Sequence, residues 1–156
     1  MARDAGVSPR APYRHFADRE ELLSALAAQA FADFAAVLAS ADAGSTVDHA
    51  IEAQAIAYVR FALAAPARFR LMFGPRRVSP GNGLASAKAS AFGVLEDRVT
   101  RDAVRHGDAR ARAVGLWAMA HGLAVLFLDE RIRGEIDGGD DEIVRRVTAA
   151  VLSSAC

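Results

Sequence analysis

The sequence has 156 residues, a formal net charge of zero and 53% hydrophobic residues, with alanine the most frequent. This length is enough to bury a core without disulfides or metals, and the zero net charge excludes a surface that attracts nucleic acid or membranes as a whole. The only cysteine is the last residue, Cys156, which excludes a disulfide framework and a thiolate metal cluster.

The first segment, residues 3–23, has the sequence RDAGVSPRAPYRHFADREELL and is typical of the second half of a helix-turn-helix. Ser8 is a suitable N-cap for a helix whose first residue is Pro9. Arg10 and Arg14 are four residues apart and share a face that could lie in a DNA major groove. From spacing alone, an ordinary surface helix with solvated arginines is the alternative.

A long amphipathic helix is predicted next. Asp18 followed by Glu21 is a capping box, and the apolar residues after it recur at helical spacing until about residues 41–44. This helix is expected to join two parts of the molecule. A second helix is predicted to begin at residues 45–46 and to end before Pro66.

Three features of the middle of the chain follow from its prolines and glycines. Residues 66–73 predict a short helix with Pro66 in its first turn and Gly74 as its C-terminal cap. Residues 75–83 hold two prolines and two glycines and predict a loop. Residues 84–106 predict another helix.

The C-terminal part predicts two further helices, at residues 109–131 and 141–153. The first is apolar all round, which indicates burial on more than one side. Its most apolar run, residues 114–128, is shorter than the roughly 20 residues of a membrane span. No strand alternation is evident, so the predicted fold class is all-α, in a soluble, cytoplasmic protein without a membrane partner.

The quoted residues also resemble a known family. ARDAGVSPRAPYRHFADREELL is similar to the end of the helix-turn-helix of TetR transcriptional regulators, with departures at Pro12 and Arg19. PARFRLMFG, together with Trp117, His121 and Gly122 in LWAMAHGLAVL, resembles the branch whose ligand-binding domain carries a Trp-His-Gly signature. Pro12 is usual in that branch. The resemblance covers essentially the whole chain.

The resemblance implies a division of the chain into two domains. Residues 1–40 would be the C-terminal part of a DNA-binding domain with its connecting helix, and residues 41–156 a helical ligand-binding and dimerisation domain. The implied DNA contacts are Ser8, Pro9, Arg10, Ala11, Tyr13, Arg14, His15 and, on phosphate, Arg19.

The implied function is that of a homodimeric regulator, commonly a repressor. It would bind palindromic operator DNA and be released by a small apolar or amphipathic effector, with the dimer formed through residues 109–131 and 141–153. A helical dimer that binds a ligand or a partner, without DNA binding, is the alternative. Family members carry further helices ahead of ARDAGVS. Their absence before Met1, which could be an internal valine codon read as a start, places DNA binding by residues 1–156 alone in doubt.

Candidate ligand contacts can be named on the apolar helices. Trp117 and His121 lie one turn apart, and His121 would supply a polar group to an otherwise apolar pocket. A histidine in the core or at the dimer interface, hydrogen-bonded to backbone, is the alternative. The further candidates are Phe61, Phe69, Met72 and Phe92.

No catalytic residues stand out in the sequence. His49 and Glu52 form the one pair of histidine and carboxylate at helical spacing, and one such pair does not make a metal site. No glycine-rich phosphate loop, nucleophile elbow or Cys and His pair occurs. The sequence therefore predicts a protein that is not an enzyme and holds no metal or cofactor.

Overall fold

The computed structural model describes residues 16–46, 49–74, 83–102 and 108–153. Within these residues the chain forms helices α1 (Arg19–Ala43), α2 (Ala50–Ala64), α3 (Pro66–Phe73), α4 (Leu84–Asp102), α5 (Ala109–Leu128) and α6 (Asp140–Ser153). The described part contains no strand beyond one isolated bridge between Arg133 and Ile136. The all-α prediction is confirmed.

The predicted capping box begins α1. The Asp18 carboxylate accepts a hydrogen bond from the Glu21 N–H at 2.8 Å, and the Glu21 carboxylate accepts one from the Ala17 N–H at 2.5 Å. Both bonds satisfy backbone donors that the first turn of a helix leaves free. The buried face of α1 consists of Ser24, Ala27, Ala30, Phe31, Phe34, Leu38 and Asp42.

Helix α2 begins later than predicted. The sequence placed its start at residues 45–46, whereas the first residue of α2 is Ala50. The Ser45 hydroxyl donates to the Ala41 carbonyl at 2.9 Å, so this serine completes the end of α1 and does not cap α2. The prediction was wrong because a serine can bond a preceding carbonyl as readily as a following N–H.

Helix α3 has the predicted bounds. Gly74 follows it, and its N–H donates to the Arg70 carbonyl at 2.8 Å. A Cβ at position 74 would lie 2.2 Å from the Arg70 oxygen, a distance that no side chain tolerates. Close approach of the two backbones therefore explains the glycine.

The other helices differ slightly from their predicted bounds. Helix α5 ends at Leu128, three residues before the predicted end, and Glu130 adopts a positive φ of 55° just beyond it. Helix α6 begins one residue earlier than predicted, at Asp140. The expected end of α4 near residue 106 lies outside the described residues.

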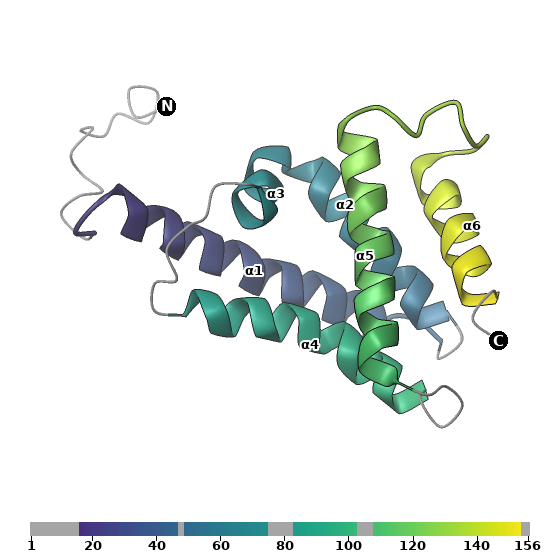
Figure 1. Ribbon diagram of the computed structural model, residues 1–156, viewed down its shortest axis with the longest axis horizontal. Coiled ribbons are helices and arrows are strands. Elements are labelled where there is room, and N and C mark those ends of the chain that lie inside the picture. Colours follow the sequence, from purple (N-terminus) through teal and green to yellow (C-terminus); the bar gives the residue numbers. More distant parts are fainter. Residues whose placement is uncertain (1–15, 47–48, 75–82, 103–107, 154–156) are drawn as a thin grey trace.

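Helix α2 contacts each of the other five helices (Figure 1). Helices α1 and α4 lie side by side and run in the same direction, since Phe31 contacts Lys88 and Asp42 contacts Arg98 farther along both helices. Helix α5 crosses α2 and α4, and α6 packs mainly against α2. The core thus lies between α1, α2, α4 and α5.

Two helices are long and apolar enough to pass a length and composition test for membrane spans, namely α1 and α5. Helix α5 extends beyond the apolar run of residues 114–128, so its length does not exclude a membrane span. The test is weak for one or two helices, because the core helix of a soluble protein passes it too. Both helices contribute large side chains to the core, including Phe31, Phe34 and Phe127.

Candidate functional site

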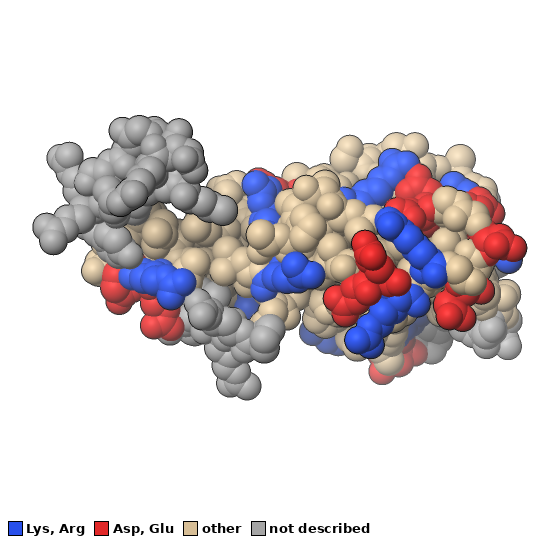
Figure 2. All heavy atoms as spheres, turned by 90° about the horizontal axis from the view of Figure 1, so that it is seen from above, with Lys and Arg blue, Asp and Glu red and all other residues tan. Residues whose placement is uncertain are grey.

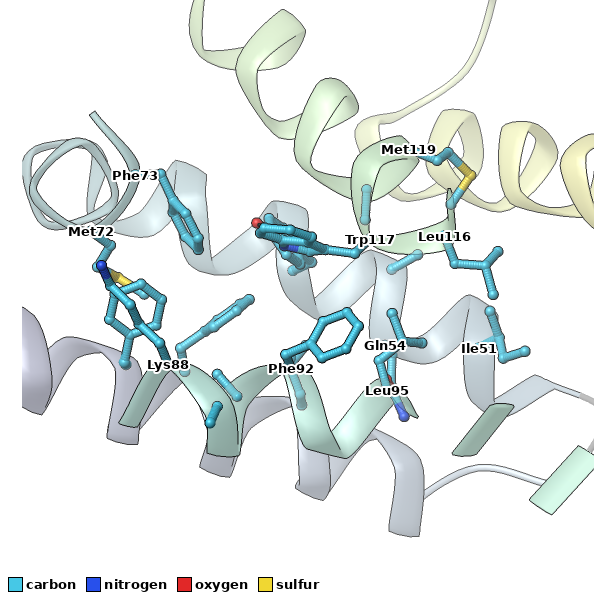
Figure 3. A pocket seen from close by; sticks show the side chains of 18 residues that line it. Ile51, Gln54, Met72, Phe73, Lys88, Phe92, Leu95, Leu116, Trp117 and Met119 are labelled. Atoms are coloured by element: carbon cyan, nitrogen blue, oxygen red, sulfur yellow. The ribbon is translucent and has the colours of Figure 1, made fainter. Parts of the chain in front are cut away.

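A cavity of about 370 Å³ lies between α1, α2, α4 and α5, with the end of α3 beside it. This volume falls within the range of small-molecule sites, which are mostly apolar with a few polar groups. Figure 3 shows the cavity from close by. Its larger lining side chains are Phe31, Phe34, Leu38, Ile51, Gln54, Tyr58, Met72, Phe73, Lys88, Phe92, Leu95, Leu116, Trp117 and Met119.

Three of the six predicted ligand contacts line this cavity: Met72, Phe92 and Trp117. The other three, Phe61, Phe69 and His121, are not among the residues that line it. Phe61 packs against Phe34 and Phe69 stacks on the His121 ring, with ring centroids 5.0 and 5.5 Å apart. Contact of any of the six with a ligand stays a prediction.

The two signature side chains, Trp117 and His121, are joined by Tyr58 of α2. The Trp117 indole N–H donates to the Tyr58 hydroxyl oxygen at 3.3 Å, and that hydroxyl lies 3.0 Å from Nδ1 of His121. Indole is only a donor, so the hydroxyl keeps its own hydrogen for His121. We call this set the Tyr58 chain. The partner of Nδ1 of His121 is thus a side chain, and not the backbone group that the alternative interpretation of His121 named.

Burial keeps the Tyr58 chain uncharged. Desolvation lowers the pKa of His121 below its ordinary value of 6.5, which favours a neutral ring whose Nδ1 accepts the Tyr58 hydrogen. Desolvation also raises the pKa of Tyr58, and the bond from Trp117 opposes this only in part. Tyr58 was not among the residues predicted to contact a ligand, although a lone hydroxyl among the apolar positions of α2 was an available signal.

A second polar group, not predicted, borders the cavity near the end of α1. Arg98 of α4 donates to both Asp42 carboxylate oxygens, at 2.6 and 2.8 Å. Gln54 of α2 donates its Nε2 to Oδ1 of Asp42 at 2.9 Å, and Arg101 lies 3.4 Å from Oδ2. We call these four residues the Asp42 cluster. It joins α1, α2 and α4 at one place.

The Asp42 carboxylate is held ionised. The hydrogen bonds from Arg98 lower its pKa below the ordinary 3.8 most strongly; burial opposes this, and Gln54 and Arg101 contribute further lowering. Asp42 and Arg98 are 9% and 8% exposed, so this is a buried ion pair, whereas the Arg101 side chain is 59% exposed. Nothing in the local sequence marks Asp42, because its partners come from distant helices.

Seven of the eight predicted DNA contacts lie outside the described residues: Ser8, Pro9, Arg10, Ala11, Tyr13, Arg14 and His15. Arg19, the eighth, is exposed at the first residue of α1. On the face shown in Figure 2, basic and acidic side chains of the described residues intermingle and form no continuous basic area. Contacts of the eight predicted residues with DNA stay predictions.

No group of three or more potential metal ligands occurs among the described residues. His49 and Glu52 are paired at 3.2 Å, and the His49 side chain is 71% exposed. This geometry is that of a surface contact between neighbouring helical residues.

Comparisons with known proteins bear on the same residues. Residues 51–151 match the family described as "Tetracyclin repressor-like, C-terminal domain". A protein with unknown function from Rhodococcus sp. RHA1 is similar in structure, with a TM-score of 0.84 and 31% identity, over 99% of this chain and 81% of that one. The "putative regulatory protein SCO4313" has a TM-score of 0.70 and 25% identity, over 94% of this chain and 79% of that one. No curated protein matches the sequence.

Proposed function

This chain belongs to the TetR family of regulators, and we propose that it is a ligand-responsive transcriptional repressor that binds palindromic operator DNA as a homodimer. The observation that carries the proposal is the apolar cavity of about 370 Å³ within the matched domain. A regulator with a cavity of this size has room for a small apolar or amphipathic effector. The proposal includes a cytoplasmic location and no catalytic activity.

The position of the cavity supports a coupling between effector and DNA. Phe31, Phe34 and Leu38 of α1 line the cavity, and α1 follows directly on the proposed DNA-reading segment. An effector that packs better against one placement of α1 therefore favours that placement. In the proposed mechanism, the favoured dimer holds its two recognition helices at a spacing that no longer fits successive major grooves.

The outward faces of α5 and α6 support the proposed dimer. Val114, Val125 and Leu126 of α5 and Val151 of α6 are 37–45% exposed in the single chain. Open space surrounds Gly115 and Gly122 of α5, which would allow a partner helix to approach closely. Burying these side chains between two copies would remove apolar surface from water.

The dimer is tested by sedimentation of the wild type and of two matched variants. Val125→Asp places a charge in the proposed interface, so we expect it to sediment as a monomer at concentrations where the wild type is a dimer. Val37→Asp is the control, because Val37 is similarly exposed (39%) but lies on α1. Dissociation by Val37→Asp, and not by Val125→Asp, would contradict the proposed interface.

The DNA-binding proposal is tested by selection from a random pool of duplexes, followed by gel shifts at several salt concentrations. The protein is the chain itself and, in parallel, the chain with any coding sequence in frame ahead of Met1. We expect a palindrome to be selected and its affinity to fall steeply as salt rises. Arg10→Ala should change base preference, whereas Arg19→Ala should weaken all sequences alike.

Two results would contradict the DNA-binding proposal. Equal losses from Arg10→Ala and Arg19→Ala on every sequence would show that the two residues do not divide base reading and phosphate binding. Failure of both proteins to select any sequence would favour the alternative, a helical dimer that binds a ligand or partner without binding DNA.

A further inference from the structure

The Gln54 side chain is buried with only one end of its amide satisfied. It is 3% exposed, and its Nε2 donates to Oδ1 of Asp42 at 2.9 Å. Its Oε1 is buried and has no hydrogen-bond partner among the described residues. A buried carbonyl oxygen without a donor is costly, and such atoms are rare in folded proteins.

The two ends of this amide cannot be exchanged. Asp42 is ionised because Arg98 holds its pKa low, and an ionised carboxylate only accepts hydrogen bonds. Turning the Gln54 amide by 180° would place Oε1 against that carboxylate and lose the bond from Nε2. The unsatisfied atom of Gln54 is therefore an acceptor, held in place by the Asp42 cluster.

Gln54 lines the cavity, near Ile51 and Leu95 (Figure 3), whereas Asp42 is not among the lining residues. Lys88 lies toward the other end of the cavity, with its Nζ 5.6 Å from the centre of the Phe31 ring. Most of the remaining lining is aliphatic or aromatic. The cavity thus offers an apolar volume with one unsatisfied acceptor beside it.

We infer that the effector is a largely apolar molecule with an O–H or N–H group that donates a hydrogen bond to Oε1 of Gln54. This inference rests on the proposed function, because it names the chemistry of the ligand of the same cavity. A donor at Oε1 also polarises the amide and strengthens the bond from Nε2 to Asp42. The ligand would thereby tighten the contact between α2 and the end of α1.

The first test compares two probes of nearly equal shape, 2-naphthol and 2-fluoronaphthalene, by calorimetric titration of the wild-type chain. Both present the same aromatic body, but only 2-naphthol donates a hydrogen bond. We expect 2-naphthol to bind about tenfold more tightly, the effect of supplying a donor to a buried acceptor. The hydroxyl is better hydrated than fluorine, so equal or weaker binding of 2-naphthol would overturn the inference.

The second test repeats the titrations on Gln54→Met, which keeps a side chain of similar length and removes the acceptor. The preference for 2-naphthol should disappear while 2-fluoronaphthalene still binds. Gln29→Met is the matched control, because Gln29 also donates its Nε2 to an aspartate, Asp33 at 2.8 Å, but lies exposed on α1. A preference that survives Gln54→Met would overturn the inference.

A crystal structure of the 2-naphthol complex provides a readout that does not depend on the folding of any variant. The phenolic oxygen should lie about 2.8 Å from Oε1 of Gln54. A water bound to Oε1 in its place would overturn the inference. If neither probe binds the wild type, both the proposed effector cavity and the role of Gln54 are contradicted. If both probes bind equally, the effector cavity is supported and the role of Gln54 is contradicted.

Discussion

The two polar groups beside the cavity are built in opposite ways. The Tyr58 chain is neutral and sequential, with Trp117 donating to Tyr58 and Tyr58 to His121. The Asp42 cluster is charged and convergent, with three side chains donating to one carboxylate. The first leaves neither its indole nor its hydroxyl without a partner, whereas the second leaves Oε1 of Gln54 unsatisfied.

This difference separates two uses of polarity in an apolar core. A polar group whose donors and acceptors are matched within the protein fixes the packing of its helices. It leaves no unsatisfied atom for a ligand to bond. A group with one acceptor left over is stabilised by a molecule that supplies a donor. The Tyr58 chain is therefore expected to act on stability, and Gln54 on ligand choice.

The largest expected effect comes from breaking the buried ion pair. Arg98→Met should destabilise the fold by about 3–5 kcal/mol, because it leaves the buried Asp42 carboxylate without its main partner. Urea unfolding followed by circular dichroism measures the loss. The double variant Asp42→Leu with Arg98→Met should recover much of it, since no charge is then buried unpaired. A double variant that is less stable than Arg98→Met would contradict this account.

A smaller loss is expected from Tyr58→Phe, which removes the hydroxyl in the middle of the Tyr58 chain. Among the described residues, Nδ1 of His121 then has no donor and the Trp117 indole has no acceptor, which should cost about 1–3 kcal/mol. The same unfolding measurement applies. Ser153→Ala is the control, because it removes an exposed hydroxyl that donates to the Ala150 carbonyl and should change stability little. Equal effects of Tyr58→Phe and Ser153→Ala would contradict the role of the Tyr58 chain.

The two groups should also respond to acid in different pH ranges. The pKa of His121 is lowered by folding, so its contribution is complete above pH 6.5 and is lost as the pH falls from 6.5 through the folded pKa. The Asp42 pKa is lowered as well, so its contribution is lost only below pH 3.8. Unfolding free energies measured from pH 8 to 3 should show two separate declines. His121→Gln should remove the one that begins near pH 6.5, and a decline that persists in this variant would count against His121.

The sequence predicted the helices better than the polar contacts. Capping at Asp18, Pro66 and Gly74 is local chemistry, so those helix ends were predicted within a residue. The start of α2 failed because Ser45 had two possible backbone partners and bonded the preceding carbonyl. These errors concern single turns and leave the fold unchanged.

The site was only partly predictable for a related reason. Large apolar residues at helical spacing mark a core, and Met72, Phe92 and Trp117 were predicted to line a cavity and do so. Periodicity does not tell which buried residue faces an opening. The Asp42 cluster joins residues up to 59 positions apart, and no local sequence pattern predicts such a contact.

The smallest expected effect is that of Arg101→Met, which tests whether burial, and not charge alone, lets the Asp42 cluster stabilise the fold. Arg101 contacts the same carboxylate as Arg98, but at 3.4 Å and with 59% of its side chain exposed. Solvent screens such a contact, so Arg101→Met should cost less than about 1 kcal/mol. It should also leave the preference of the cavity for 2-naphthol unchanged, because Gln54 keeps its bond to Asp42. A loss from Arg101→Met as large as that from Arg98→Met would show that total charge around Asp42, and not the desolvated pair, stabilises this end of α1.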